Sequence, residues 1–198
     1  MTESPSTVDA RRTALLMMDY QPSALDRLAD PDALLDCAAS AIATVRTAGG
    51  HVGYVRVASE DGDYDAMPAT SRMAARLASA GHALHNDSPA TAVHERVAPQ
   101  AGDIVVRKTR VGAFSTTDLH EQLQQRGITT LILSGVSTSG VVLSTVRDAS
   151  DRDYQLFVLA DCCADPDPAV HEFLVERIFP RQAHVVPPGE LTRLLRAG

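Results

Sequence analysis

Short apolar runs alternate along the whole chain with segments whose apolar positions follow a helical spacing. The runs are continuous rather than alternating with polar residues, which is typical of strands buried on both faces. They predict six strands, at residues 13–18, 51–57, 103–107, 129–134, 154–160 and 183–186. The segments with helical spacing predict helices over 32–48, 69–80, 116–126, 139–152 and 168–179, and a last turn or two over 191–196.

This order of elements indicates the fold class. Strands that alternate with helices favour a three-layer α/β/α arrangement around a mostly parallel, six-stranded sheet. A chain of 198 residues is long enough for one such core, and no repeat or linker divides it. We therefore expect one domain over residues 12–198, preceded by a flexible polar tail over 1–11.

The topology also predicts where a ligand binds. In open parallel sheets the ligand crevice lies beyond the carboxyl ends of the strands, near a switch in strand order. The positions that follow predicted strands are Asp19, the loop after Val57, Lys108, the turn 135–140 and Asp161. A carboxylate at a buried strand end can act as an acid or a base, and a lysine can pair with it or bind an anion.

Charge and cysteine content limit the classes of binding partner and the cellular compartment that we expect. The net charge is −7 and the basic residues are scattered, which argues against nucleic acid and against anionic membrane surfaces. No apolar run has the length of a membrane span or the form of a signal peptide. The three cysteines, Cys37, Cys162 and Cys163, lack zinc-site spacing, which predicts free thiols in a reducing, cytoplasmic compartment.

Several short motifs carry a resemblance to a known family. They are the run 14–19 ending in Asp19, with Gln21 after it; Lys108 with Ala113 and Phe114; and the stretch 127–138 before a helix. In this order the chain resembles the isochorismatase-like, or cysteine hydrolase, superfamily from about residue 13 to 191. The resemblance implies the α/β fold given above, hydrolysis of a small-molecule substrate, Gln21 and Phe114 as pocket lining, and a homodimer or homotetramer.

The resemblance also implies a site built by Asp, Lys and Cys, with one departure in this chain. It assigns Asp19 and Lys108 to the first two roles, and it puts Val141 where the nucleophilic cysteine stands in the family. It further implies a cis peptide between Val136 and Ser137, and an oxyanion hole formed by the backbone N–H groups of Ser137 and Val141. Because valine has no nucleophilic atom, thiol catalysis at this position is excluded.

Metal chemistry is not expected. Nicotinamidases in the same superfamily carry an aspartate and two histidines soon after the second strand, whereas residues 58–64 contain no histidine. We expect no metal and no cofactor.

Three functional hypotheses remain open. The first is a hydrolase that uses Asp19 and Lys108 for acid–base catalysis without a thiol, on a small molecule that can be anionic. The second is a non-catalytic, ligand-binding or regulatory family member, suggested by Val141. The third is a hydrolase with a relocated nucleophile, either Cys162, Cys163 or a serine of the turn 137–139.

Overall fold

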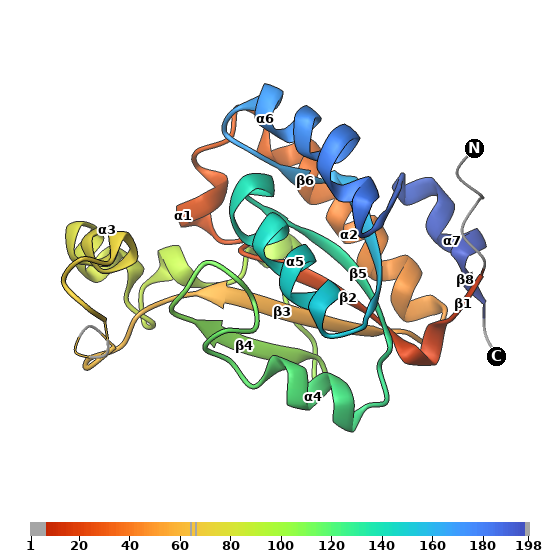
Figure 1. The fold of residues 1–198 in the computed structure, drawn as a ribbon, viewed down its shortest axis with the longest axis horizontal. Coiled ribbons are helices and arrows are strands. Elements are labelled where there is room, and N and C mark those ends of the chain that lie inside the picture. Colours follow the sequence, from red (N-terminus) through yellow and green to blue (C-terminus); the bar gives the residue numbers. More distant parts are fainter. Residues whose placement is uncertain (1–6, 64, 66, 197–198) are drawn as a thin grey trace.

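The computed structural model describes residues 7–63, 65 and 67–196 (Figure 1). Of the predicted tail, residues 1–6 lie outside this part. The prediction is wrong at residues 8–11, where strand β1 (Val8–Asp9) pairs in parallel with β8 (Leu195–Arg196) and a short 3₁₀ turn leads into the sheet. A two-residue pair between the chain ends has no periodicity that a sequence could reveal.

The central sheet confirms the predicted fold class. All of its neighbouring strands are parallel, in the order β4-β3-β2-β5-β6-β7. The strands are β2 (Thr13–Met18), β3 (His51–Val57), β4 (Ile104–Lys108), β5 (Thr130–Val136), β6 (Gln155–Ala164) and β7 (His184–Val186). The chain leaves β2 for β3 on one side and later returns to place β5 on the other side, so the switch in strand order falls between β2 and β5.

Helices cover both faces of the sheet (Figure 1). One face packs under α2 (Pro31–Thr47) and α7 (Leu191–Leu194), and the other under α4 (Leu119–Gln125), α5 (Leu143–Asp151) and the turn that continues α6 (Pro168–Phe173). Successive residues of β2 enter opposite cores, with Leu15 and Met17 in the first and Leu16 and Met18 in the second. This double burial explains why the strands read as continuous apolar runs.

The prediction of free thiols is wrong for two of the three cysteines. Cys37 of α2 and Cys162 of β6 form a disulfide, with their Cα atoms 5.7 Å apart. They are 125 residues apart in the sequence and meet because α2 packs against β6. Since the reducing compartment was inferred from free thiols, that inference loses its basis.

Two short helices stand outside the three layers. Helix α1 (Pro22–Leu25) directly follows β2, and α3 (Arg72–Ala80) lies on the connection between β3 and β4, where it projects from the body at the left of Figure 1. Helix α3 has a small apolar cluster of its own, built from Met67, Leu77 and Leu84. No helix among the described residues has both the length and the apolar character needed to span a bilayer.

Candidate active site

Asp19 sits where β2 ends, at the switch in strand order. Its backbone adopts a positive φ of 59°, and its N–H still donates to the carbonyl of Val55 at 2.8 Å. The strand therefore pairs up to this residue, and the left-handed conformation ends it there. The Asp19 side chain is only 9% exposed.

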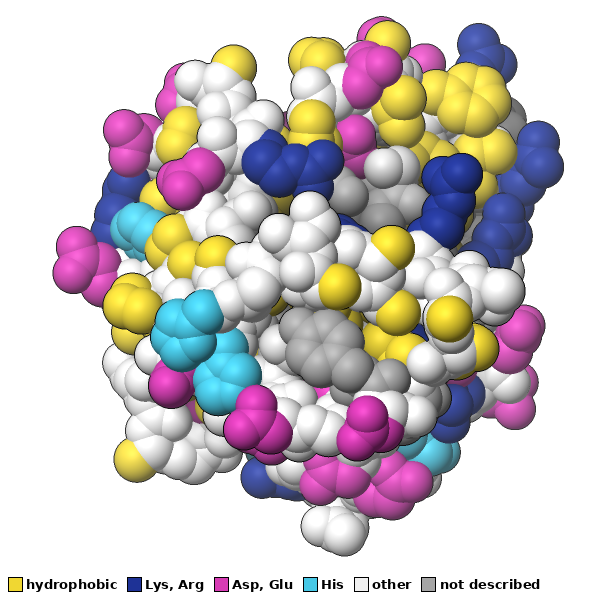
Figure 2. Space-filling view, turned by 90° about the vertical axis from the view of Figure 1, so that its left-hand side faces the viewer, with side chains coloured by type: hydrophobic (Ala, Val, Ile, Leu, Met, Phe, Trp, Pro, Cys, Tyr) yellow, Lys and Arg dark blue, Asp and Glu magenta, His cyan; other side chains and the backbone are white. Residues whose placement is uncertain are grey.

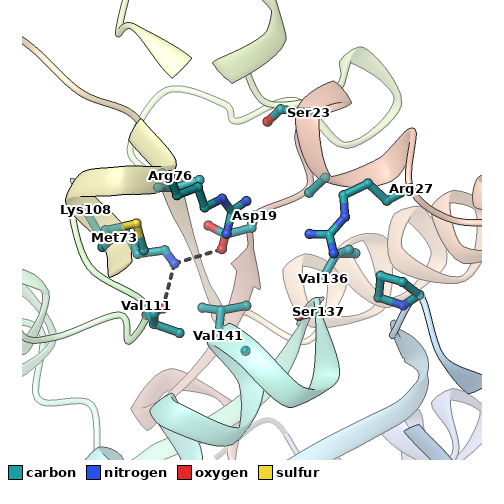
Figure 3. A pocket seen from close by; sticks show the side chains of 14 residues that line it. Asp19, Ser23, Arg27, Met73, Arg76, Lys108, Val111, Val136, Ser137 and Val141 are labelled. Atoms are coloured by element: carbon teal, nitrogen blue, oxygen red, sulfur yellow. Dashed lines mark hydrogen bonds and ion pairs between the residues drawn. The ribbon is translucent and has the colours of Figure 1, made fainter. Parts of the chain in front are cut away.

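Lys108 ends β4 and reaches Asp19 from the side. Its Nζ lies 2.8 Å from Oδ2 of Asp19 and donates to the carbonyl of Val111 at 2.7 Å (Figure 3). The side chain of Lys108 is 2% exposed, and it is the one lysine in the sequence. An ammonium held by these two acceptors acts as the partner of Asp19, so the geometry favours pairing over the other predicted role, contact with an anionic substrate.

The two oxygens of Asp19 have different surroundings. Oδ2 is paired with Lys108, whereas Oδ1 is buried and has no hydrogen-bond partner in the part of the chain that the structure describes. Burial raises the pKa of Asp19 above its usual range, and the ammonium of Lys108 opposes that rise. A buried carboxyl with one open oxygen at the lining of a pocket is suited to hold and release a proton.

The turn after β5 closes the pocket from below. The peptide between Val136 and Ser137 is cis, as the resemblance predicts, and one π-helical turn, Thr138–Val142, leads into α5. The carbonyl of Ser137 accepts hydrogen bonds from the N–H groups of Gly140 and Val142. A Cβ atom at Gly140 would lie 2.8 Å from Oγ of Ser137, so a side chain at this position would require the Ser137 hydroxyl to rotate away.

Further contacts hold this turn from outside the pocket. The N–H of Ser139 donates to Oδ2 of Asp165 at 2.8 Å, and the hydroxyl of Thr138 is hydrogen-bonded to Nδ1 of His171 at 2.8 Å. The side chain of Thr138 is thus engaged in holding the turn.

Val141 borders the same pocket as Asp19 and Lys108. Its side chain stands beneath the pair in Figure 3, on the turn that also brings Ser137 and Gly140 to the lining. Ser137 and Val141, the residues expected to supply the oxyanion hole, are therefore both at the pocket. The topology brings together four of the residues predicted from the sequence: Asp19, Lys108, Ser137 and Val141.

Gln21 and Phe114 were expected to line the pocket and are not among the residues that do so. The buried amide of Gln21 donates to the carbonyls of Val57 and Thr91 and accepts from the N–H of Val57, at 2.6–2.9 Å. It therefore fastens the end of β3 rather than facing a ligand. Phe114 stacks on Tyr154 and lies under the guanidinium of Arg152, within the core on the α5 side.

The hypothesis of a relocated cysteine nucleophile is not supported at this pocket. Cys162 is in the disulfide, and neither Cys162 nor Cys163 is among the lining residues. Burial raises the pKa of Cys163 to about 12, which keeps it a neutral thiol at ordinary pH. Of the turn serines, Ser137 borders the pocket.

Two arginines at the pocket were missed by the sequence reasoning. Arg27, just after α1, and Arg76 of α3 both line it, together with Met73 of α3. Neither arginine follows a strand, so the rule that found Asp19 and Lys108 could not find them. Their positions depend on how the β3–β4 connection folds back.

One group in the described part of the chain has the donors for a metal ion. His82, His85 and Asp87 offer ligand atoms that all lie within 4.8 Å of one another, in the turn after α3. None of the three borders the pocket of Asp19. The group is therefore separate from that pocket.

Comparison with known proteins agrees with this geometry. The model of the isochorismatase domain matches residues 13–187, nearly the whole sheet and its helices. The chain belongs to the isochorismatase family. The match starts at the strand that ends in Asp19 and includes Lys108 and the turn that carries Val141.

Two relatives by sequence and one solved structure show how far the likeness extends along the chain. The chain is 32% identical over 174 residues to YwoC of Bacillus subtilis, an uncharacterised family protein, covering 88% of this chain and 89% of that one. It is 28% identical over 191 residues to the maleamate amidohydrolase of Pseudomonas putida, covering 94% and 88%. An isochorismatase family protein from Burkholderia thailandensis superposes with a TM-score of 0.81 at 26% identity, covering 97% and 99%.

Proposed function

We propose that this isochorismatase-family hydrolase works without a thiol nucleophile, using Asp19 as the group that moves protons and Lys108 as its partner. The observation that carries the proposal is the open oxygen of Asp19, buried at the pocket and unpartnered among the described residues. In this proposal Val141 occupies the position of the family's cysteine, so the pocket has an apolar side chain where covalent attack would otherwise begin.

Hydrolysis of a vinyl ether is the reaction that fits such a site best. Protonated Asp19 gives its proton to the enol carbon, which leaves a carboxylate and an oxocarbenium ion. Water adds to that ion and gives a proton back to Asp19, and the resulting hemiketal separates into a carbonyl compound and an alcohol. The step needs a carboxyl that is protonated near neutral pH, and burial raises the pKa of Asp19 in that direction.

In this scheme Lys108 also stabilises the ionised form of Asp19. When Asp19 is a carboxylate, between the two proton transfers, the ammonium 2.8 Å away stabilises that charge in a buried setting. It thereby keeps the pKa of Asp19 from rising so far that the proton is never released. The pair can therefore pass through both protonation states within one turnover.

Amide hydrolysis is the second candidate, because a relative with 28% identity is named an amidohydrolase. In this chain an amide would be attacked by water, with the Asp19 carboxylate taking the water's proton and the backbone turn at Ser137 and Val141 holding the oxyanion. Asp19 would then give that proton to the amide nitrogen as the C–N bond breaks, which releases the amine and leaves the carboxylic acid. Both candidates use the same pocket and the same carboxyl group.

A substrate panel separates these reactions from plain binding. We expect purified protein to turn over small carboxylated vinyl ethers faster than the amides of the same acids, with no covalent adduct in intact-mass spectra of quenched reactions. An adduct at a serine or cysteine would contradict the proposal. Tight binding across the panel without any turnover would favour a regulatory, non-catalytic role instead.

A further inference from the structure

We propose that Arg27 and Arg76 form a two-sided clamp for a carboxylate group of the substrate, so that the substrate class is a small carboxylic acid. The inference rests on the proposed function for the reacting group, because it places the acid next to Asp19. It stands on observations of its own, namely where the two guanidinium groups lie and what surrounds them.

The two arginines approach the pocket from different elements. Arg76 comes from α3 and its guanidinium lies beside Asp19, while Arg27 comes from the turn after α1 and points toward Val136 and Ser137 (Figure 3). The charge of Arg76 is close enough to lower the pKa of Asp19, against the larger effect of burial. The space between the two side chains lies above Val141, next to the open oxygen of Asp19.

Both arginines are exposed. Within the described ranges, neither guanidinium forms an ion pair or a side-chain hydrogen bond. Other arginines of the same chain do have carboxylate partners. Examples are Arg46 with Asp103, Arg107 with Asp63 and Arg152 with Asp148. Arginine offers a planar fork of donors that matches a carboxylate, so two unpaired forks facing one space suit an anion.

The residues that line the pocket carry a net positive charge, as an anion site requires. Its basic groups are Arg27, Arg76 and Lys108, and Asp19 is the one acidic group. Since Lys108 is paired with Asp19, two positive charges remain, in a chain whose net charge is −7. Figure 2 looks onto this side of the molecule, where Lys and Arg side chains stand in the upper half and acidic side chains gather along the lower edge.

The rest of the lining limits what the acid can carry. Val136 and Val141 form an apolar floor, and Met73 of α3 adds an apolar wall. An apolar floor under two guanidinium groups favours a carboxylate on a short carbon skeleton over a bare inorganic anion. The reacting carbon would then lie above Val141, within reach of Asp19.

The test is a binding titration with three molecules of nearly equal size, succinate, succinamate and succinamide, which differ in charge. Isothermal titration of the full chain should give affinity in that order, with succinamide bound weakly or not at all. Arg27→Gln and Arg76→Gln should each weaken succinate binding by roughly tenfold or more, as expected for a lost charge-assisted hydrogen bond. Arg76→Lys, which keeps the charge and loses the fork, should fall in between.

Arg72→Gln is the matched control, because Arg72 is an exposed arginine on the same helix and does not border the pocket. It should bind succinate like the unmodified protein, and melting curves should show every variant folded. Equal binding of all three molecules, no binding of succinate, unchanged affinity in both glutamine variants, or inorganic phosphate binding more tightly than succinamate would each overturn the clamp.

Binding and turnover give separate answers here. Charge-dependent binding without turnover would support the clamp and count against the proposed hydrolysis. Turnover that is indifferent to both arginines would do the reverse.

Discussion

Asp19→Asn is expected to lower turnover by roughly 10²–10⁴-fold, the usual contribution of a positioned general acid or base, while small acids still bind. The amide that replaces the carboxyl has nearly the same shape but cannot donate or accept the transferred proton. The new amide oxygen can still accept a hydrogen bond from the ammonium of Lys108, which lies 2.8 Å from the carboxylate in the unmodified protein. That buried ammonium loses its counter-charge, so the pocket becomes more positive, and a melting curve must show that the variant is folded. Steady-state kinetics and titration of the same sample measure the two effects.

Asp161→Asn is the control for this variant. Asp161 is an exposed aspartate on β6, and it does not border the pocket. Its variant should keep the activity of the unmodified protein. Undiminished activity of Asp19→Asn would remove Asp19 from the mechanism, and loss of binding along with turnover would make its role one of shaping the pocket.

Lys108→Met should cost roughly 3–5 kcal/mol of unfolding free energy near neutral pH, the usual effect of leaving one partner of a buried ion pair behind. The side chain is 2% exposed, and its ammonium is the only cation within salt-bridge distance of Asp19 among the described residues. Urea denaturation measures the change. The double variant Asp19→Asn/Lys108→Met should recover part of the loss, because no unpaired charge stays buried.

The loss of unfolding free energy caused by Lys108→Met should become smaller as the pH falls. Burial already raises the pKa of Asp19, and loss of the ammonium that opposes this rise raises it further. Between the unfolded and the folded pKa the folded state then binds more protons than the unfolded state, so stability decreases as the pH rises. Denaturation at acidic and at neutral pH checks the sign; a deficit that grows toward acidic pH would contradict the assignment of Asp19 as the buried partner.

The sequence predicted those strands whose residues are buried on both faces, because that burial produces a continuous apolar run. The limits of β2 and β3 match the predicted runs because every residue in them is packed between two helical layers or nearly so. The strand β6 runs on to Ala164, beyond the predicted end at 160, because its last residues pair with β5 after an irregularity between Leu133 and Gly135. That irregularity depends on the neighbouring strand and leaves no mark in the run itself.

The site was predictable where topology alone places a residue. Asp19 and Lys108 end parallel strands, and such ends meet at one edge of a sheet. Arg27 lies just after α1 and Arg76 lies on α3. The positions of these two helices depend on tertiary packing. The same holds for the Cys37–Cys162 disulfide, which depends on the packing of α2 against β6.

The most direct test of thiol-independent hydrolysis is turnover by a variant without cysteine, Cys37→Ala/Cys162→Ala/Cys163→Ala, which removes the disulfide and the free thiol of Cys163 together. Loss of the disulfide will lower stability, so circular dichroism and a cooperative melting curve must first show a folded protein. We predict that this folded variant hydrolyses the substrate at the rate of the unmodified protein, and that adding Asp19→Asn to it lowers the rate by the same roughly 10²–10⁴-fold. A folded, cysteine-free protein that binds substrate but no longer turns it over would contradict the account.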